Sequence, residues 1–380
     1  MRRLAAPVGL ALLGLVSVGA GCGVLQPVDP YQGERVSVDW AEPLYALEVF
    51  PYHPVEPAQP LYVRSAQTPA GGIVVVPAKD RVVRALDAVS GKTLWSFETK
   101  GPNVAKPVAE GDDLVIASTD GHVYRVSQRN GRASWVSEFP GGAGVLSAPA
   151  IGGGRVFVTS IDNRITALDY ETGERQWERK RPHLTELTVS GQAGALLVKD
   201  LVVTGFSDGQ LVAFMQADGV TAWSADLSGG GKDFVDVDST PVLVGNLVIA
   251  SCYKRGVFAV DVDTGNIAWV VKGEGYGTAT VFEGQVFVPQ ALGSVIAIDG
   301  ASGTVGWRAK LSGEIAGTPA ASEHYLLVPG GESLVVLDKG TGRALSHFDD
   351  GHSFYATPEL AYGTAYVLGG SGTIYALGVY

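Results

Sequence analysis

One short pattern recurs along this chain at intervals of about forty residues, and it constrains the fold more than any other feature. Its template is Ala167-Leu168-Asp169, followed after three residues by Gly173 and after three more by Trp177. Six copies keep the Trp, namely those with Trp95, Trp135, Trp177, Trp223, Trp269 and Trp307. A seventh copy carries Ser346 instead, and an eighth ends the chain at Ala376-Leu377-Gly378. Repeats of this period predict a solenoid, a propeller or a similar array.

Each copy of the repeat is expected to be a β-hairpin. The apolar residues before the Asp favour a strand, and the Gly suits a tight turn that needs a positive φ. The next strand places the Trp at a fixed offset, so that every copy presents it to the same side. Two further strands precede each copy, as in 147–151 and 155–159. Eight such four-stranded units predict an all-β fold, an eight-bladed β-propeller; seven blades is the alternative if one copy is degenerate.

The two ends of the chain together provide one blade. The eighth copy has no fourth strand of its own, whereas Val36-Ser37-Val38-Asp39-Trp40 is a strand with a Trp in the proper register. We therefore predict that this N-terminal strand completes the last blade and closes the ring, which hides edges that an open array would expose. The propeller is predicted to span residues 35–380.

The first residues have the features of a targeting segment. Arg2 and Arg3 precede an apolar stretch, residues 8–18, that is short for a membrane span. Gly19-Ala20-Gly21-Cys22 then resembles a bacterial lipobox, with Gly19 where Leu is usual. This predicts a signal peptide over 1–21, lipidation of Cys22, and a lipidated tether over 22–34. The alternative is ordinary cleavage after Ala20, which would release a soluble protein.

Charge and cysteine content exclude several classes of protein. The net charge is −11, and losing residues 1–21 would make it more negative, so nucleic acid is a poor partner. With Cys22 lipidated, Cys252 would be the one remaining thiol, which rules out a disulfide framework. Because Cys252 lies in an apolar strand, we expect it to be a small core residue.

The repeat resembles that of the quinoprotein propellers, which include dehydrogenases that use pyrroloquinoline quinone. Such enzymes add an adjacent cysteine pair, calcium-binding carboxylates and a catalytic Asp, and the cysteine pair is absent here. A quinoprotein dehydrogenase is therefore the alternative function, and we predict no cofactor. His347 and His352 flank Asp-Asp-Gly, which favours a turn over a metal site, so no metal is predicted. The Gly-rich run 229–231 lacks the spacing of a phosphate-binding loop.

A narrower resemblance lies in two long connections between repeats. Residues 187–191, Leu-Thr-Val-Ser-Gly, and residues 236–242, Asp-Val-Asp-Ser-Thr-Pro-Val, resemble the BamB family, lipoproteins of the outer-membrane β-barrel assembly machinery. The resemblance implies a non-catalytic scaffold, lipid-anchored at the periplasmic face of the outer membrane. It further implies that these connections dock onto a POTRA domain of the barrel-inserting subunit, BamA, and it suggests contact with nascent outer-membrane proteins by edge pairing.

The resemblance assigns the partner-binding residues by position: Leu187, Val189, Ser190, Asp236 and Asp238. The family more typically has Arg where Ser190 stands. Two apolar side chains beside two carboxylates would form a small hot spot, with the acids selecting a basic patch on the partner. The alternative is that Leu187 and Val189 pack under their loop while the two acids bond turn amides. A third possibility for the whole chain is a generic extracytoplasmic propeller that binds another protein.

Overall fold

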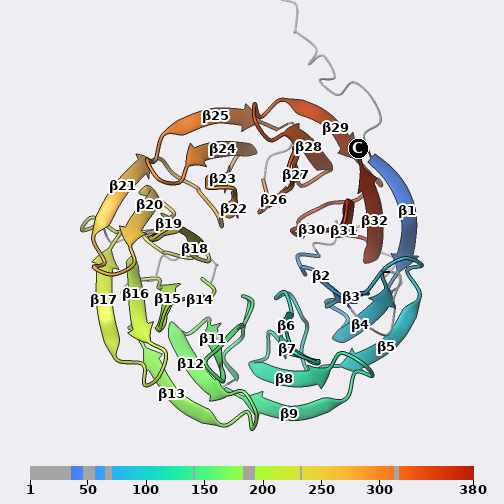
Figure 1. The fold of residues 1–380 in the computed structure, drawn as a ribbon, viewed down its shortest axis with the longest axis horizontal. Helices are drawn as coiled ribbons and strands as arrows, with labels where there is room; N and C mark the ends of the chain where they lie inside the picture. The colour runs from blue at the N-terminus through green and yellow to red at the C-terminus, as the bar shows by residue number, and fades with distance from the viewer. Residues whose placement is uncertain are drawn as a thin grey trace, which may run out of the picture. The chain divides into compact units, whose positions relative to one another are not determined.

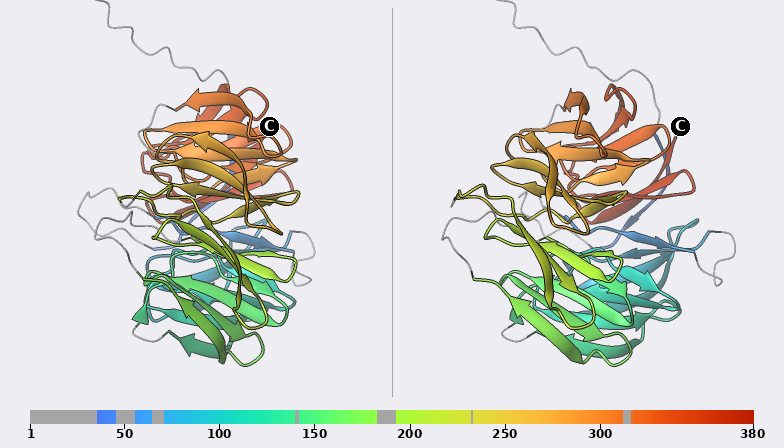
Figure 2. Two further views of the ribbon diagram at one scale, coloured as in Figure 1. Left: turned by 90° about the vertical axis from the view of Figure 1, so that its left-hand side faces the viewer. Right: turned by 60° about the vertical axis from the view of Figure 1, so that its left-hand side comes forward.

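The computed structural model describes residues 36–45, 56–64, 71–139, 142–182, 193–231, 233–311 and 316–380. Within these ranges the strands form eight antiparallel sheets of four strands each, set as blades around a central opening (Figure 1). Figure 2 shows the same ring from the side. The predicted all-β, eight-bladed propeller is confirmed. No helix in the described part of the chain is long and apolar enough to cross a membrane.

Every blade places its first strand nearest the opening and its fourth at the outer rim. The first strands are β2 (Leu61–Val63), β6 (Val108–Glu110), β10 (Ala150–Gly152), β14 (Leu196–Val198), β18 (Val242–Val244), β22 (Thr280–Phe282), β26 (Ala320–Ala321) and β30 (Glu359–Ala361). The second strands are β3 (Ile73–Val76), β7 (Asp113–Ala117), β11 (Arg155–Ser160), β15 (Leu201–Gly205), β19 (Leu247–Cys252), β23 (Gln285–Gln290), β27 (Tyr325–Pro329) and β31 (Thr364–Leu368).

The third and fourth strands form the hairpins of the repeat. The third strands are β4 (Val82–Asp87), β8 (His122–Ser127), β12 (Arg164–Asp169), β16 (Gln210–Met215), β20 (Gly256–Asp261), β24 (Ser294–Asp299), β28 (Leu334–Asp338) and β32 (Thr373–Val379). The fourth are β5 (Thr93–Glu98), β9 (Ala133–Glu138), β13 (Arg175–Lys180), β17 (Thr221–Asp226), β21 (Ile267–Lys272), β25 (Val305–Lys310), β29 (Ala344–Phe348) and β1 (Val36–Pro43).

Strand direction sorts the loops of the propeller onto two faces. Because successive strands are antiparallel, turns between second and third strands lie on the same face as the connections between blades. We call this the connection face. The other face carries the first-to-second turns and the third-to-fourth turns of the repeat, and we call it the tryptophan face. Insertions between blades therefore accumulate on the connection face.

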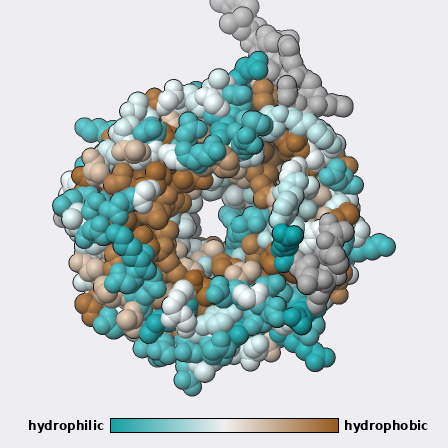
Figure 3. Space-filling view, in the orientation of Figure 1, coloured by the Kyte–Doolittle hydropathy of each residue, from teal (hydrophilic) through white to brown (hydrophobic). Residues whose placement is uncertain are grey.

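The core lies in the middle two strands of each blade. All four residues of β3 are buried, as are the middle residues of β12 and β23, because both sides of these strands pack against a neighbouring blade. The outer strands instead alternate, as in β5, where Trp95 is buried between exposed neighbours. In the space-filling view, hydrophobic residues gather around the central opening and hydrophilic ones toward the rim (Figure 3).

The Trp of the repeat joins each blade to the next. Its indole Nε1 donates to the backbone oxygen that follows the Asp position of the next copy, at 2.6–3.1 Å. The seven pairs are Trp40–Ala88, Trp95–Gln128, Trp135–Tyr170, Trp177–Gln216, Trp223–Val262, Trp269–Gly300 and Trp307–Lys339. The ring also covers the turn Gly of that copy, which has a φ of 68° to 75°. A Cβ added at Gly265 would meet Trp223 at 2.9 Å.

The missing eighth Trp has a structural explanation. Ser346 occupies the Trp position of β29, and the blade that follows has no third-to-fourth turn, because β32 ends the chain and β1 begins near its start. There is thus no Gly for a Trp to cover. An aromatic cluster of Phe348, Phe354 and Tyr375 packs at this junction instead.

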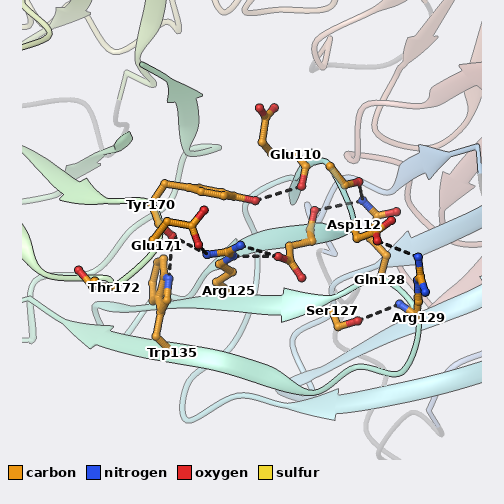
Figure 4. A network of polar contacts seen from close by, with 12 residues as sticks. Glu110, Asp112, Arg125, Ser127, Gln128, Arg129, Trp135, Tyr170, Glu171 and Thr172 are labelled. Carbon is orange, nitrogen blue, oxygen red and sulfur yellow. Dashed lines mark hydrogen bonds and ion pairs between the residues drawn. The ribbon is translucent and has the colours of Figure 1, made fainter. Parts of the chain in front are cut away.

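The second copy of the repeat has Ser127 in place of the Asp and carries an ionic network at its junction with the next blade (Figure 4). Arg125 stands where most copies have Ala, and its guanidinium lies 4.1 Å from the centroid of the Tyr170 ring in the next blade. It also pairs with Asp113 at 2.8 Å and with Glu171 at 2.6 Å. Asp113 lies in the same blade as Arg125 and holds its largely buried guanidinium in place, while the contacts with Tyr170 and the exposed Glu171 reach the next blade.

The N-terminal strand closes the ring as predicted. Seven residue pairs join β1 to β32, from Val36 opposite Val379 to Pro43 opposite Thr373, with a bulge between Val38 and Trp40. The signal peptide over 1–21, the tether over 22–34 and the lipidated Cys22 lie outside the described residues and stay predictions.

Candidate functional site

The first long connection follows β13 and leads to β14. Leu187, Val189 and Ser190 lie within 183–192, outside the described residues. The start of the connection is held by Arg181, whose Nε donates to Asp208 Oδ2 at 2.7 Å. Its end is held at Gly194, whose amide donates to Thr240 Oγ1 at 2.9 Å. Both anchors belong to other segments of the connection face.

The second long connection follows β17 and leads to β18, and it shares its supports with the first. Leu227 N donates to Gly209 O at 2.9 Å, and Val237 N donates to Phe206 O at 3.1 Å. These acceptors lie in the β15–β16 turn, which also supplies Asp208 to Arg181. The two connections predicted from the sequence are therefore fixed to one turn of the β14–β17 blade.

The two acidic residues of the second connection point inward. Asp236 is 3% exposed and Asp238 is partly buried. Burial raises the pKa of Asp238 to about 6, and the neighbouring Asp236 charge adds to this, although a backbone amide opposes it. Their role as partner-binding residues stays a prediction.

Cys252 lies directly beneath this connection at the end of β19. It is fully buried, and its thiol donates to Val235 O at 3.1 Å. Burial raises the pKa of Cys252 to about 12; the charge of Arg255 opposes this rise, and the charges of Asp238 and Asp236 add to it. Since the thiolate is the nucleophile, the thiol is unreactive here and serves as a core residue, as the apolar strand around it predicts.

Charged side chains on the inner strands of the ring already have partners within the protein. On β30, Glu359 pairs with Lys106 at 2.6 Å and accepts from Tyr62 N at 3.1 Å. These contacts cap the free edge of β2 and tie three blades together. Among the residues that the structure describes, no group of three or more His, Cys, Asp or Glu side chains could hold a metal ion.

A cleft of about 490 Å³ lies on the tryptophan face, beside the closing strand. Its aromatic walls include Trp40, Tyr62, Tyr362 and Tyr366. Trp40 Nε1 and the Tyr366 hydroxyl both donate to Ala88 O, at 3.1 and 3.2 Å, and the Tyr62 hydroxyl donates to Gly71 O. These polar atoms already bond within the protein, so the cleft is best described as the seam between the closing blade and β2–β5.

Comparison with known proteins decides the family. The family model for the outer membrane protein assembly factor BamB matches residues 23–143, 138–281 and 256–379, which together cover almost the whole chain. The chain belongs to the BamB family. Among its relatives, the BamB of Bordetella pertussis is 27% identical over 303 residues, 77% of each chain. That of Burkholderia pseudomallei is 29% identical over 323 residues, 80% of this chain and 81% of the relative.

Solved structures agree on the fold. The crystal structure of BamB from Moraxella catarrhalis superposes with a TM-score of 0.74 at 18% identity, covering 90% of this chain and 97% of that one. A quinohemoprotein alcohol dehydrogenase from Pseudomonas putida has a TM-score of 0.73 at 11% identity, covering 91% of this chain and 76% of that one. At these identities the BamB fold is shared with enzymes, so shape alone does not separate the two functions.

Sequence reasoning identified the BamB-like connections but missed the side chains that surround the second one. Phe234 precedes the two acids, Lys254 in the β19–β20 turn lies over its ring, and Arg255 in the same turn lies against Gly229. A signal for the two cations was present, because Lys-Arg-Gly directly after an apolar strand is typical of an exposed turn. That this turn lies against the second connection is a tertiary property, and nothing in the local sequence indicates it.

Proposed function

We propose that this chain is a non-catalytic scaffold of the outer-membrane β-barrel assembly machinery. The observation that carries the proposal is the match of the BamB family model from residue 23 to residue 379. A second support is the joint anchoring of the two long connections on one blade, which concentrates inserted residues in one place on the connection face. Loops on a rigid scaffold are where binding residues are concentrated.

The proposed partner is the POTRA region of a BamA-like barrel-inserting protein. Leu187, Val189 and Ser190 would contribute from the first connection, with Asp236 and Asp238 shaping the second. The proposed location is the periplasmic face of the outer membrane, with the chain anchored through Cys22. Nascent outer-membrane proteins are proposed as further ligands, because the rim strands of eight blades offer free edges.

Co-purification from membranes tests the docking. Leu187→Arg combined with Val189→Glu should abolish recovery of the POTRA-containing protein with a tagged chain, because both changes put charge at an apolar contact. Asp236→Lys is a poor probe, since it would bury a charge. Val89→Arg is the matched control: Val89 is exposed on the tryptophan face, so recovery should stay unchanged. Equal recovery with the double variant, its fold being intact, would reject the docking assignment.

The absence of catalysis is tested separately. Calorimetry with pyrroloquinoline quinone and calcium is expected to show no binding in the micromolar range. Sub-micromolar binding would instead support a quinoprotein enzyme and would overturn this part of the proposal.

A further inference from the structure

Phe234 occupies an unusual backbone conformation in the second connection. Its φ is 53°, in the left-handed region that a bulky side chain seldom adopts. The neighbouring Val235 is 4% exposed and packs in the core, whereas Phe234 is only partly buried. Strained residues of this kind persist when the surrounding structure enforces them, and they concentrate at functional sites. The connection therefore holds an aromatic ring at the surface.

Two cations of the β19–β20 turn lie against the second connection. Lys254 Nζ is 4.7 Å from the centroid of the Phe234 ring, and the Arg255 guanidinium lies against the backbone of Gly229. Both side chains are exposed. Within the described ranges neither forms an ion pair, in contrast to Arg181 on the neighbouring blade, which is paired with Asp208. Asp233, next to Phe234 in the chain, is exposed as well.

The acids of the same connection lie beneath this surface. Asp236 is 3% exposed and Asp238 is partly buried, whereas Lys254 and Arg255 are exposed. The surface of the second connection thus presents an aromatic ring and two cations, beside the acids that the family resemblance assigns to the contact.

We propose that Phe234, Lys254 and Arg255 form a docking patch for an acidic surface with an apolar pocket on the POTRA-containing partner. This inference rests on the proposed function and specifies the chemistry of the contact. Aromatic residues and Arg are enriched at the energetic centres of interfaces. Because the Phe234 ring is already held in place, it loses little conformational entropy when it enters a pocket on the partner. The two cations would steer an acidic partner toward a chain that is acidic overall.

Affinity measurements on the full mature protein test the patch. The probe is the purified POTRA region of the barrel-inserting protein from the same organism, measured by biolayer interferometry. Phe234→Gly, which suits the positive φ, should weaken binding at least about tenfold by removing the anchor. Lys254→Glu with Arg255→Glu should weaken it at least about tenfold at low salt, and less at high salt because the charges are then screened. Lys92→Glu, at an exposed turn on the tryptophan face of another blade, should leave binding unchanged.

The outcomes separate this inference from the proposed function. If the unaltered protein does not bind the POTRA region, the proposed function fails. If it binds and the Lys254 and Arg255 reversals bind equally well or more tightly, the acidic-partner inference is overturned while the function stands. Circular dichroism and thermal unfolding confirm that each variant is folded, and the charge reversals keep the test decisive even if Phe234→Gly is unstable.

Discussion

At the scale of single residues, the contact between one Trp and one Gly forms seven of the eight blade junctions. The Gly is needed for two reasons, a positive φ and the close approach of an indole ring. Comparing two glycines separates these reasons. Gly265 has a φ of 72° and lies under Trp223, whereas Gly284 has a φ of 80° and faces open space.

We predict that Gly265→Ala destabilises the protein by about 3 kcal/mol, the sum of a left-handed backbone and an overpacked ring. Gly284→Ala has only the backbone contribution and should cost about 1 kcal/mol. Urea unfolding of both variants measures the difference. Equal losses would show that the indole contact adds nothing to the need for Gly.

A pH-dependent prediction concerns Asp238. Its pKa is raised to about 6 by burial and by Asp236, so the folded state binds its proton more tightly than the unfolded state does. Ionisation of Asp238 therefore opposes folding. The free energy of unfolding is highest below about pH 4, where this carboxyl is protonated, and it falls as the pH rises through about 6. Asp238→Asn should gain stability over the unaltered protein across that range, reaching at most about 3 kcal/mol above it.

Asp162 provides the control of opposite sign. Burial there favours the neutral acid, but hydrogen bonds from Ser160, Lys180 and Arg164 outweigh it and lower the pKa to about 2. Asp162→Asn should therefore lose stability at every pH above about 4. Chemical unfolding between pH 4 and pH 8 compares the two variants. A pH-independent difference for Asp238→Asn would contradict the assignment of its pKa.

The placement of Asp236 and Asp238 shows where residue-level prediction stops. An acid in a connection is usually solvated, and the local sequence does not indicate that these two are enclosed. Here the β15–β16 turn and the β19–β20 turn enclose the segment from two blades, as the bonds of Val237 N to Phe206 O and Tyr253 N to Asp236 O show. Both turns are separated from the segment along the sequence, and the closed propeller brings the three together.

At the scale of elements, the closing strand was predictable because its features are local. Val36 to Trp40 alternates, carries the repeat's Trp, and stands without a blade of its own. The four-strand unit was likewise visible from the turn Gly and the apolar runs. The burial of β3 on both sides was not, since it results from the flanking blades rather than from any period within the strand.

We predict that removing residues up to 43 lowers the melting temperature and causes self-association, because β32 then has an unpaired edge. A synthetic peptide of residues 36–43 added in trans should restore the monomer by pairing with that edge. The same peptide with Trp40→Ala should restore it less well, since it lacks the bond to Ala88 O. Size-exclusion chromatography reports the result; a truncated chain that stays monomeric would argue against a closing role.

At the scale of the whole molecule, the two ends of the described ring meet. Val36 lies opposite Val379, and Ser37 shares a hydrogen bond of 2.7 Å with the hydroxyl of Tyr380. Joining residues 36 and 380 by a short linker and opening the chain between Gly153 and Gly154 should give a folded circular permutant. A Cβ placed at Gly154 would have no neighbour within 4 Å, and a cut at this turn interrupts none of the hairpins that form the Trp–Gly junctions. Retained cooperative unfolding tests this, and a molten or aggregated product would refute it.

The pairing of β1 with β32 is expected to be the last step in folding of the ring. Ser37 and Tyr380 are 343 residues apart, so their pairing carries the largest loop-closure entropy in the ring. The blades between them need only near neighbours and can assemble earlier. Until β1 arrives, β32 is an open edge, and the β1 of a second copy would fit it equally well. The same contact that completes one ring is therefore the step at which two chains, folding side by side, would exchange their first strands.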